Sequence, residues 1–81
     1  MDFIAASSEL NNKKIVAVFQ KDSESYKRFG PRFIGQLVGR TWDNSKELTK
    51  TVVSLTILAQ NYIAYQIPCE DIQAIAEIFN L

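Results

Sequence analysis

The feature that most constrains this fold is an uncharged stretch, TVVSLTILAQNYIAYQIPC, at positions 51–69. In a chain of this size such a stretch can cross a membrane, fill a core or form a surface for a partner. A membrane-spanning helix needs about 20 predominantly apolar residues, and adjacent amides such as Gln60 and Asn61 are costly in hydrocarbon. The polarity at the centre of the stretch therefore argues for a core or a partner surface.

The length and charge of the chain limit its organisation and its partners. With 81 residues, the chain fits a single domain, 1–81. Nine basic and nine acidic residues balance, so the chain as a whole does not attract nucleic acid or an anionic membrane. A single cysteine, Cys69, excludes an internal disulfide and fits a reducing compartment. The start, MDFIAASSEL, lacks the basic region of a signal peptide, and we expect a cytoplasmic protein.

Two strands are predicted at the N-terminus. Residues 2–10 alternate weakly, and residues 13–21 contain KIVAVFQK, which is rich in β-branched side chains. Asn11 and Asn12 lie between them and tolerate positive φ, as tight turns require. We therefore expect an antiparallel hairpin.

Segment 31–39 has two interpretations. Its apolar side chains recur with helical spacing, at Phe33, Ile34, Leu37 and Val38. Gly35 weakens such a helix by about 1 kcal/mol relative to alanine. We predict a short helix over 31–39, and the alternative is a third strand with Phe33, Gly35 and Leu37 on one face.

Longer helical periods occupy the second half of the chain. Three candidate N-caps precede the first of them, at Asp43, Asn44 and Ser45. Its apolar face recurs at Leu48, Val52, Leu55, Ala59 and Tyr62. A second stripe follows Pro68, at Ile72, Ile75, Ala76 and Phe79. We predict two helices joined by a short strand, 62–67, although many residues of the first are β-branched, which weakens helix propensity.

The expected fold class is therefore α+β. An N-terminal antiparallel β-hairpin, with a third strand as an option, is predicted to pack against two or three α-helices in one small domain. In so small a domain one core does not cover every apolar helix position, and a second copy of the chain normally covers such a remainder. We accordingly expect a homodimer.

The residue types present argue against catalysis. The chain has no histidine, which removes the commonest general base and the commonest metal ligand. Glu70 and Asp71 are adjacent and would point about 100° apart on a helix, so we interpret them as partners of a helix dipole. Cys69 is interpreted as a small buried apolar side chain rather than as a reactive thiol. We expect no enzyme activity, no cofactor and no metal.

The densest candidate site is a segment in which bases and aromatic rings alternate. Residues 25–42 carry four bases and no acid before Asp43, and the predicted binding residues are Tyr26, Arg28, Arg32, Arg40 and Trp42. Phe29 and Phe33 are assigned to the core. Tyr, Trp and Arg are enriched at the energetic centres of protein interfaces. The same residue types also suit a nucleic-acid groove, and aromatic core beside a solvated loop is the third interpretation.

The functional hypothesis is stoichiometric protein binding. We expect a non-enzymatic inhibitor, adaptor or assembly subunit, and phage or mobile-element inhibitors of host machinery, including anti-defence proteins, are proteins of this type. The alternative is a nucleic-acid-binding accessory module that uses residues 26–42. Residues 51–81 contain no Lys or Arg, which argues against a recognition helix there because phosphate contacts need those side chains.

Overall fold

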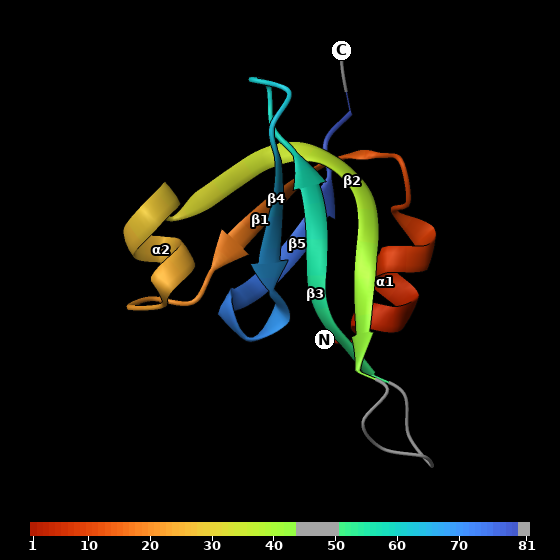
Figure 1. The fold of residues 1–81 in the computed structure, drawn as a ribbon, viewed down its shortest axis with the longest axis horizontal. Helices are drawn as coiled ribbons and strands as arrows, with labels where there is room; N and C mark the ends of the chain where they lie inside the picture. The colour runs from red at the N-terminus through yellow and green to blue at the C-terminus, as the bar shows by residue number, and fades with distance from the viewer. Residues whose placement is uncertain (44–50, 80–81) are drawn as a thin grey trace.

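The computed structural model describes residues 1–43 and 51–79, and it shows a five-stranded antiparallel sheet with two short helices (Figure 1). The elements, in chain order, are α1 (Phe3–Glu9), β1 (Lys14–Phe19), α2 (Glu24–Phe29), β2 (Arg32–Asp43), β3 (Thr51–Leu58), β4 (Ala64–Pro68), the 3-10 helix η1 (Cys69–Asp71) and β5 (Ile72–Glu77). The predicted hairpin packed on two or three helices is therefore wrong.

The strands lie in the order β4-β3-β2-β1-β5, so that the first and last strands of the chain are neighbours. β2 is the longest strand and arches across the others, so that the sheet is strongly curved (Figure 1). The curvature encloses one core, whose apolar members are Ile15, Ala17, Phe19, Leu37, Val52, Leu55, Ile57, Ile67, Cys69 and Ile72. The helices α1 and α2 lie at opposite sides of the molecule (Figure 1).

The N-terminal residues form a helix rather than the first strand of a hairpin. The side chain of Asp2 accepts hydrogen bonds from the backbone N–H groups of Ile4 and Ala5, at 3.0 and 3.2 Å, and so caps α1. Phe3 and Leu10, seven residues apart, both pack against the core. Asn12 does take a positive φ of 65°, but it links α1 to β1 instead of joining two strands.

All of segment 31–39 except Pro31 belongs to β2, so the predicted helix is wrong and the alternative strand is observed. β2 pairs with β1 on one side and with β3 on the other. The backbone of β3 approaches Gly35 so closely that an added Cβ would lie 2.5 Å from the carbonyl oxygen of Leu58. Glycine is found in strands at such close approaches, which accounts for a residue that a helix would disfavour.

The first predicted long helix is replaced by β3. The β-branched residues of TVVSLTIL outweigh the helical period, because branched side chains fit a pleated sheet better than a helix. The candidate caps Asn44 and Ser45 lie outside the described residues, and Asp43 ends β2. β4 agrees with the predicted strand 62–67.

The second predicted helix is replaced by η1 and β5. Ile72 and Ile75 are three residues apart, which suggested one helical face. In β5 a register shift opposite Val18 and Phe19 pairs Phe19 with Ile72 and Val18 with Ala74, and a bulge of this kind lets two residues of unlike parity face the same core. The spacing that suggested a helix is therefore the spacing of a strand with a bulge.

The uncharged stretch 51–69 supplies much of the core. Leu55, Ile57 and Ile67 are fully buried within one chain. Their burial removes part of the apolar surface on which the homodimer was predicted, although Val53 and Ile63 remain exposed. None of the helices in the described part of the chain has the length and apolar character needed to cross a membrane.

Candidate functional site

The candidate site begins with α2, a six-residue helix with clear local signals. The hydroxyl of Ser23 accepts a hydrogen bond of 3.0 Å from the backbone N–H of Tyr26 and caps the helix. Gly30 follows the last helical residue with a φ of 87°, a conformation that glycine adopts without strain. The cap and the glycine leave Lys27 and Arg28 in the last turn, where the helix dipole favours cations.

A buried carboxylate fixes α2 to the end of the sheet. Asp71 Oδ2 accepts hydrogen bonds from the Ser25 hydroxyl at 2.6 Å and from the Ser25 backbone N–H at 3.2 Å. The carbonyl of Asp71 also accepts a bond of 2.7 Å from the backbone N–H of Gln20. Asp71 therefore serves α2, whereas the sequence suggested that it served the dipole of its own helix. Glu70 is exposed.

Four aromatic rings pack together between α2 and the sheet. Phe29 lies edge-on to Phe33 and Tyr65, with ring centroids 4.7 and 5.2 Å apart, and it contacts the buried Phe19 at 6.1 Å. Phe33 and Tyr65 are also in edge contact, at 5.6 Å. The core assignment of Phe29 and Phe33 is confirmed in that both pack against the core, although both remain half-buried.

The exposed Arg28 lies over this aromatic cluster. Its guanidinium carbon is 4.9 Å from the centroid of Phe29 and 5.2 Å from that of Tyr65, distances at which a cation is attracted to a ring face. Arg28 forms no ion pair within the described residues, whereas its neighbour Lys27 pairs with Glu24 at 3.5 Å. The guanidinium donors of Arg28 thus remain available to a partner.

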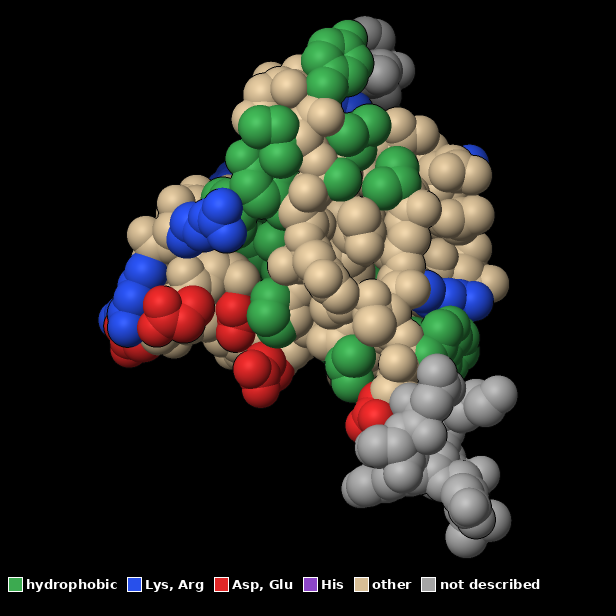
Figure 2. All heavy atoms as spheres, in the orientation of Figure 1, with side chains coloured by type: hydrophobic (Ala, Val, Ile, Leu, Met, Phe, Trp, Pro, Cys, Tyr) green, Lys and Arg blue, Asp and Glu red, His purple; other side chains and the backbone are tan. Residues whose placement is uncertain are grey.

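A groove of about 360 Å³ separates α2 from β4. The lining residues from α2 are Glu24, Ser25, Arg28 and Phe29, and the others are Gln66, Ile67, Pro68 and Asp71. Basic and acidic side chains gather on the side of the molecule where α2 lies, beside a band of hydrophobic side chains that runs toward the β3–β4 turn (Figure 2). The groove therefore combines one stacked cation with the backbone of an outer strand.

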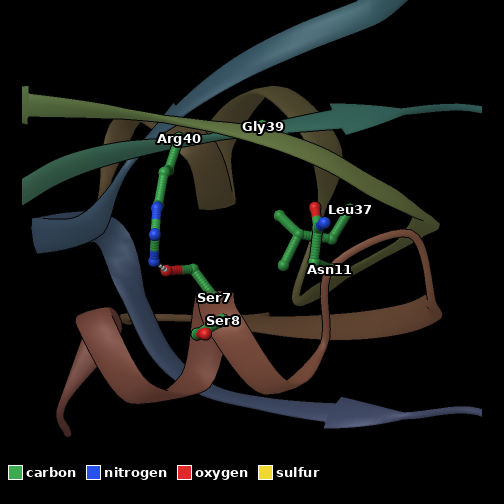
Figure 3. Close-up of a pocket in the computed structure, with 6 residues that line it drawn as sticks. All are labelled: Ser7, Ser8, Asn11, Leu37, Gly39 and Arg40. Atoms are coloured by element: carbon green, nitrogen blue, oxygen red, sulfur yellow. Dashed lines mark hydrogen bonds between the residues drawn. The ribbon is translucent and has the colours of Figure 1, made fainter.

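Arg40 has a structural position away from this groove. Its Nη1 donates hydrogen bonds to the carbonyl of Ile4 at 3.2 Å and to the hydroxyl of Ser7 at 2.8 Å, and so joins β2 to α1 (Figure 3). Its guanidinium carbon also lies 4.8 Å from the centroid of the half-buried Trp42 ring. Arg40 and Trp42 are thus occupied by contacts within the domain.

The structure divides the predicted binding residues into two groups. Arg28 is on α2, where Tyr26 is half-buried against the core, and the exposed Arg32 begins β2 just beyond that helix. Arg40 and Trp42 lie near the other end of β2, beside α1 (Figure 1). The five residues therefore do not form one continuous surface.

Two important residues had little signal in the sequence. Tyr65 was recognised only as part of an alternating strand, and its contact with Arg28 joins residues 37 positions apart. Asp71 was predicted to interact with the dipole of its own helix, but it bonds to Ser25 of α2. That partner is distant in sequence, so no local pattern indicates it. The motif of α2 itself was visible in SESYKRFG, which combines a cap with a terminal glycine.

Cys69 is buried, and burial raises the pKa of its thiol to about 11. An unfolded thiol has a pKa of about 8.5, so the stability from this group is fully present below that pH and is lost as the pH rises toward 11. We expect a chromogenic disulfide reagent at pH 8 to label the folded protein at least about 100-fold more slowly than the urea-unfolded chain, because the thiolate is the nucleophile. Equally fast labelling of both states would contradict this prediction.

Comparison of the chain with models of protein families, with curated proteins and with solved structures finds no match. Within residues 1–43 and 51–79, no three His, Cys, Asp or Glu side chains gather as metal ligands would. The groove and its stacked arginine are therefore the features of this domain that indicate a function.

Proposed function

We propose that this domain binds another protein stoichiometrically, through the surface formed by Arg28, Phe29, Tyr65 and the outer edge of β4, hereafter the α2–β4 surface. The observation that carries the proposal is the exposed guanidinium of Arg28, held over two rings. Arginine and tyrosine dominate the binding energy of many protein interfaces. A planar guanidinium also bonds to a carboxylate through two parallel hydrogen bonds.

Preorganisation supports this assignment. A long arginine side chain normally loses rotamer freedom on binding, at a free-energy cost of about 0.5–1.5 kcal/mol. Contacts with Phe29 and Tyr65 restrict Arg28 before a partner arrives. Asp71 adds a second constraint, because its bonds to Ser25 fix the helix that carries Arg28. The cation is therefore restricted directly by two rings, and the helix that carries it is fixed by Asp71.

The geometry favours a protein partner over nucleic acid. A base stacks on an aromatic face that is free to receive it. The rings of Phe29, Phe33 and Tyr65 are half-buried and pack on one another. Arg28 lies over two of these rings, and Arg40 lies over Trp42. The alternating bases and aromatics of residues 26–42 thus do not assemble into a stacking groove.

Two narrower hypotheses stay predictions. The hypothesis that the protein inhibits host machinery was based only on the general type of the chain, which is small and has no catalytic motif. No described residue supports it. Self-association has lost part of its original argument, because Val52, Leu55 and Ile57 are buried in the core of one chain, although Val53 and Ile63 are exposed. The proposal therefore concerns a partner protein and the α2–β4 surface alone.

Charge reversal at Arg28 is the direct test of this proposal. We expect Arg28→Glu to weaken binding to the partner at least tenfold, because the change removes a stacked cation and places a like charge against an acidic contact. The measurement is affinity capture from a lysate of the native host with immobilised wild-type and variant domains, followed by titration of the captured protein. The melting temperature should change little, since the side chain is exposed.

Lys27→Glu provides the matched control. Lys27 occupies the same helical turn, is exposed and has the same charge, but it pairs with Glu24 rather than stacking on a ring. Its reversal should leave capture within about threefold of wild type, since exposed ion pairs contribute little. Proteins retained equally by wild type, Arg28→Glu and Lys27→Glu would show that the α2–β4 surface is not the binding site.

A further inference from the structure

The outer edge of β4 presents unpaired backbone groups, and the pairing of β4 with β3 shows which residues carry them. Ala59 N–H donates to the carbonyl of Ile63 at 3.0 Å, and this pair is in register with the ladder that joins Ile57 to Tyr65 and Leu55 to Ile67. Hydrogen-bonded pairs alternate along an antiparallel ladder. Tyr65 and Ile67 therefore bond to β3, and the backbone groups of Ala64 and Gln66 point away from the sheet.

The position of Pro68 agrees with this alternation of inward and outward backbone groups. Proline has no N–H and is tolerated on an edge strand where that group would face outward. It pairs with Ser54 at the next outward position of β4. β4 ends the sheet, and the outward groups of Ala64 and Gln66 have no backbone partner among the described residues. The edge thus offers alternating donors and acceptors over about five residues, or roughly 17 Å of extended chain.

The space and charge beside this edge indicate what can occupy it. The groove between β4 and α2 runs along Gln66, Ile67 and Pro68. Its two acids already have partners, since Asp71 bonds to Ser25 and Glu24 pairs with Lys27. On an added strand, the side chain opposite Tyr65 lies beside that ring on the same face of the sheet. The guanidinium carbon of Arg28 lies over the same ring at 5.2 Å. A carboxylate at the opposing position would therefore meet Arg28.

We infer that the α2–β4 surface recognises an extended segment of a partner protein that adds to β4 as a sixth strand and places an Asp or Glu opposite Tyr65. This inference rests on the proposed function and specifies its mode of recognition. Strand addition supplies affinity through backbone hydrogen bonds and specificity through alternate side chains. The other outer strand, β5, does not fit an acidic segment, because its one charged residue is Glu77.

Amide exchange in the free protein tests which amides of β4 point away from β3. In the free protein, the amides of Ala64 and Gln66 should exchange with deuterated solvent rapidly, and those of Tyr65 and Ile67 at least about 100-fold more slowly, because only the latter pair bonds to β3. Nuclear magnetic resonance reads each amide separately. Slow exchange at Ala64 and Gln66 in a dilute monomer would mean that the edge is already covered, and it would overturn the inference.

Selected peptides test the occupant. A displayed library of random nine-residue peptides is panned on the wild-type domain, and the enriched sequences are synthesised as probes. We expect them to alternate β-branched residues around one Asp or Glu, to slow exchange at Ala64 and Gln66, and to lose at least tenfold in affinity on Arg28→Glu. Gln66→Pro should cause a similar loss, since it removes an outward N–H and places a ring on the edge.

Gln66→Ala is the control for the proline variant. It keeps the outward N–H while removing the side-chain bonds to Thr41 and Ser54, both 2.9 Å long, and peptide affinity should stay within about threefold. If Arg28→Glu weakens binding but Gln66→Pro does not, the acid binds without strand addition. That result would overturn the inference of strand addition but would leave the proposed protein-binding function intact.

Four other results would also overturn the inference. Enriched peptides without an acid would remove the role of Arg28, and the absence of any enriched peptide would remove the edge as a receptor. Exchange or chemical-shift changes centred on Ile34 and Tyr62 would place the peptide in the groove between β2 and the β3–β4 turn. Light scattering that shows a dimer, lost in Gln66→Pro, would identify a second copy as the occupant.

Discussion

Replacing Phe19 with alanine should lower the free energy of unfolding by about 3–5 kcal/mol. Phe19 is 2% exposed, ends β1 opposite Ile72 and is the buried member of the aromatic cluster. Removal of the ring leaves a cavity beneath Phe29, so the helix that carries Arg28 also loses support. A domain of this length has a total stability of roughly 4–12 kcal/mol, and Phe19→Ala should therefore unfold an appreciable fraction of the protein. Urea titration followed by tryptophan fluorescence measures the change.

Phe79→Ala is the matched control for this prediction. Phe79 has the same side chain but is 74% exposed, and its removal should change stability by no more than about 0.5 kcal/mol. Where Phe19→Ala fails to fold, Phe19→Leu keeps the measurement possible with a smaller loss. Equal stabilities for the two alanine variants would contradict the position of Phe19 in the core.

Gly35→Ala should lower stability by about 1–3 kcal/mol, and Gly35→Val by more. An added Cβ would lie 2.5 Å from the carbonyl oxygen of Leu58 and 2.7 Å from Cγ2 of Ile57. The first of these atoms belongs to the backbone, so β2 and β3 would have to separate where they cross. The same urea titration detects the loss, and amide exchange along β3 should become faster near Leu58.

Gly39→Ala is the corresponding control on the same strand. A Cβ at Gly39 would meet the side chain of Thr56 at 3.6 Å, which is ordinary van der Waals contact. Alanine restricts the unfolded chain more than glycine does, so Gly39→Ala should be neutral or should stabilise the protein by up to about 1 kcal/mol. A loss at Gly39 as large as that at Gly35 would show that β2 generally needs glycine and that the close approach is not the cause.

The candidate site could be predicted from the sequence only in part. The segment SESYKRFG contains the cap, the last-turn cations and the terminal glycine that define α2, and Arg28 was among the predicted binding residues. Arg40 was also predicted, but its bonds to Ile4 and Ser7 assign it to the attachment of α1. Both arginines lie near aromatic residues in the sequence. Only the folded chain shows which of them keeps its donors free.

The pairing of Arg28 with Tyr65, and of Ser25 with Asp71, depends on tertiary structure. Each pair is distant in sequence, and no local pattern records it. The outward direction of the backbone groups of Ala64 and Gln66 also depends on tertiary structure, because the register of β4 on β3 determines it. A strand could be predicted over 62–67 from its alternation, but not its position at the end of the sheet.

The sequence alone determined local features of this protein. The β-branched strand β1 and the alternation in β4 were predicted, because each depends on a few neighbouring residues whose preferences act before distant contacts form. The caps Asp2 and Ser23 are equally local, but residues 2–10 were predicted to be a strand and α2 was not predicted. The uncharged stretch 51–69 indicated that its apolar side chains would supply part of the core, as Val52, Leu55, Ile57, Ile67 and Cys69 do.

Tertiary structure decided between helix and strand for β2, β3 and β5. Apolar residues at Val52 and Leu55, or at Ile72 and Ile75, match a helical period, but bulges and shifts of register place similar spacings on one face of a strand. The choice depends on whether a partner strand is present to satisfy the backbone and cover the apolar face. That partner lies elsewhere in the chain: β1 pairs with β5 across more than 50 residues.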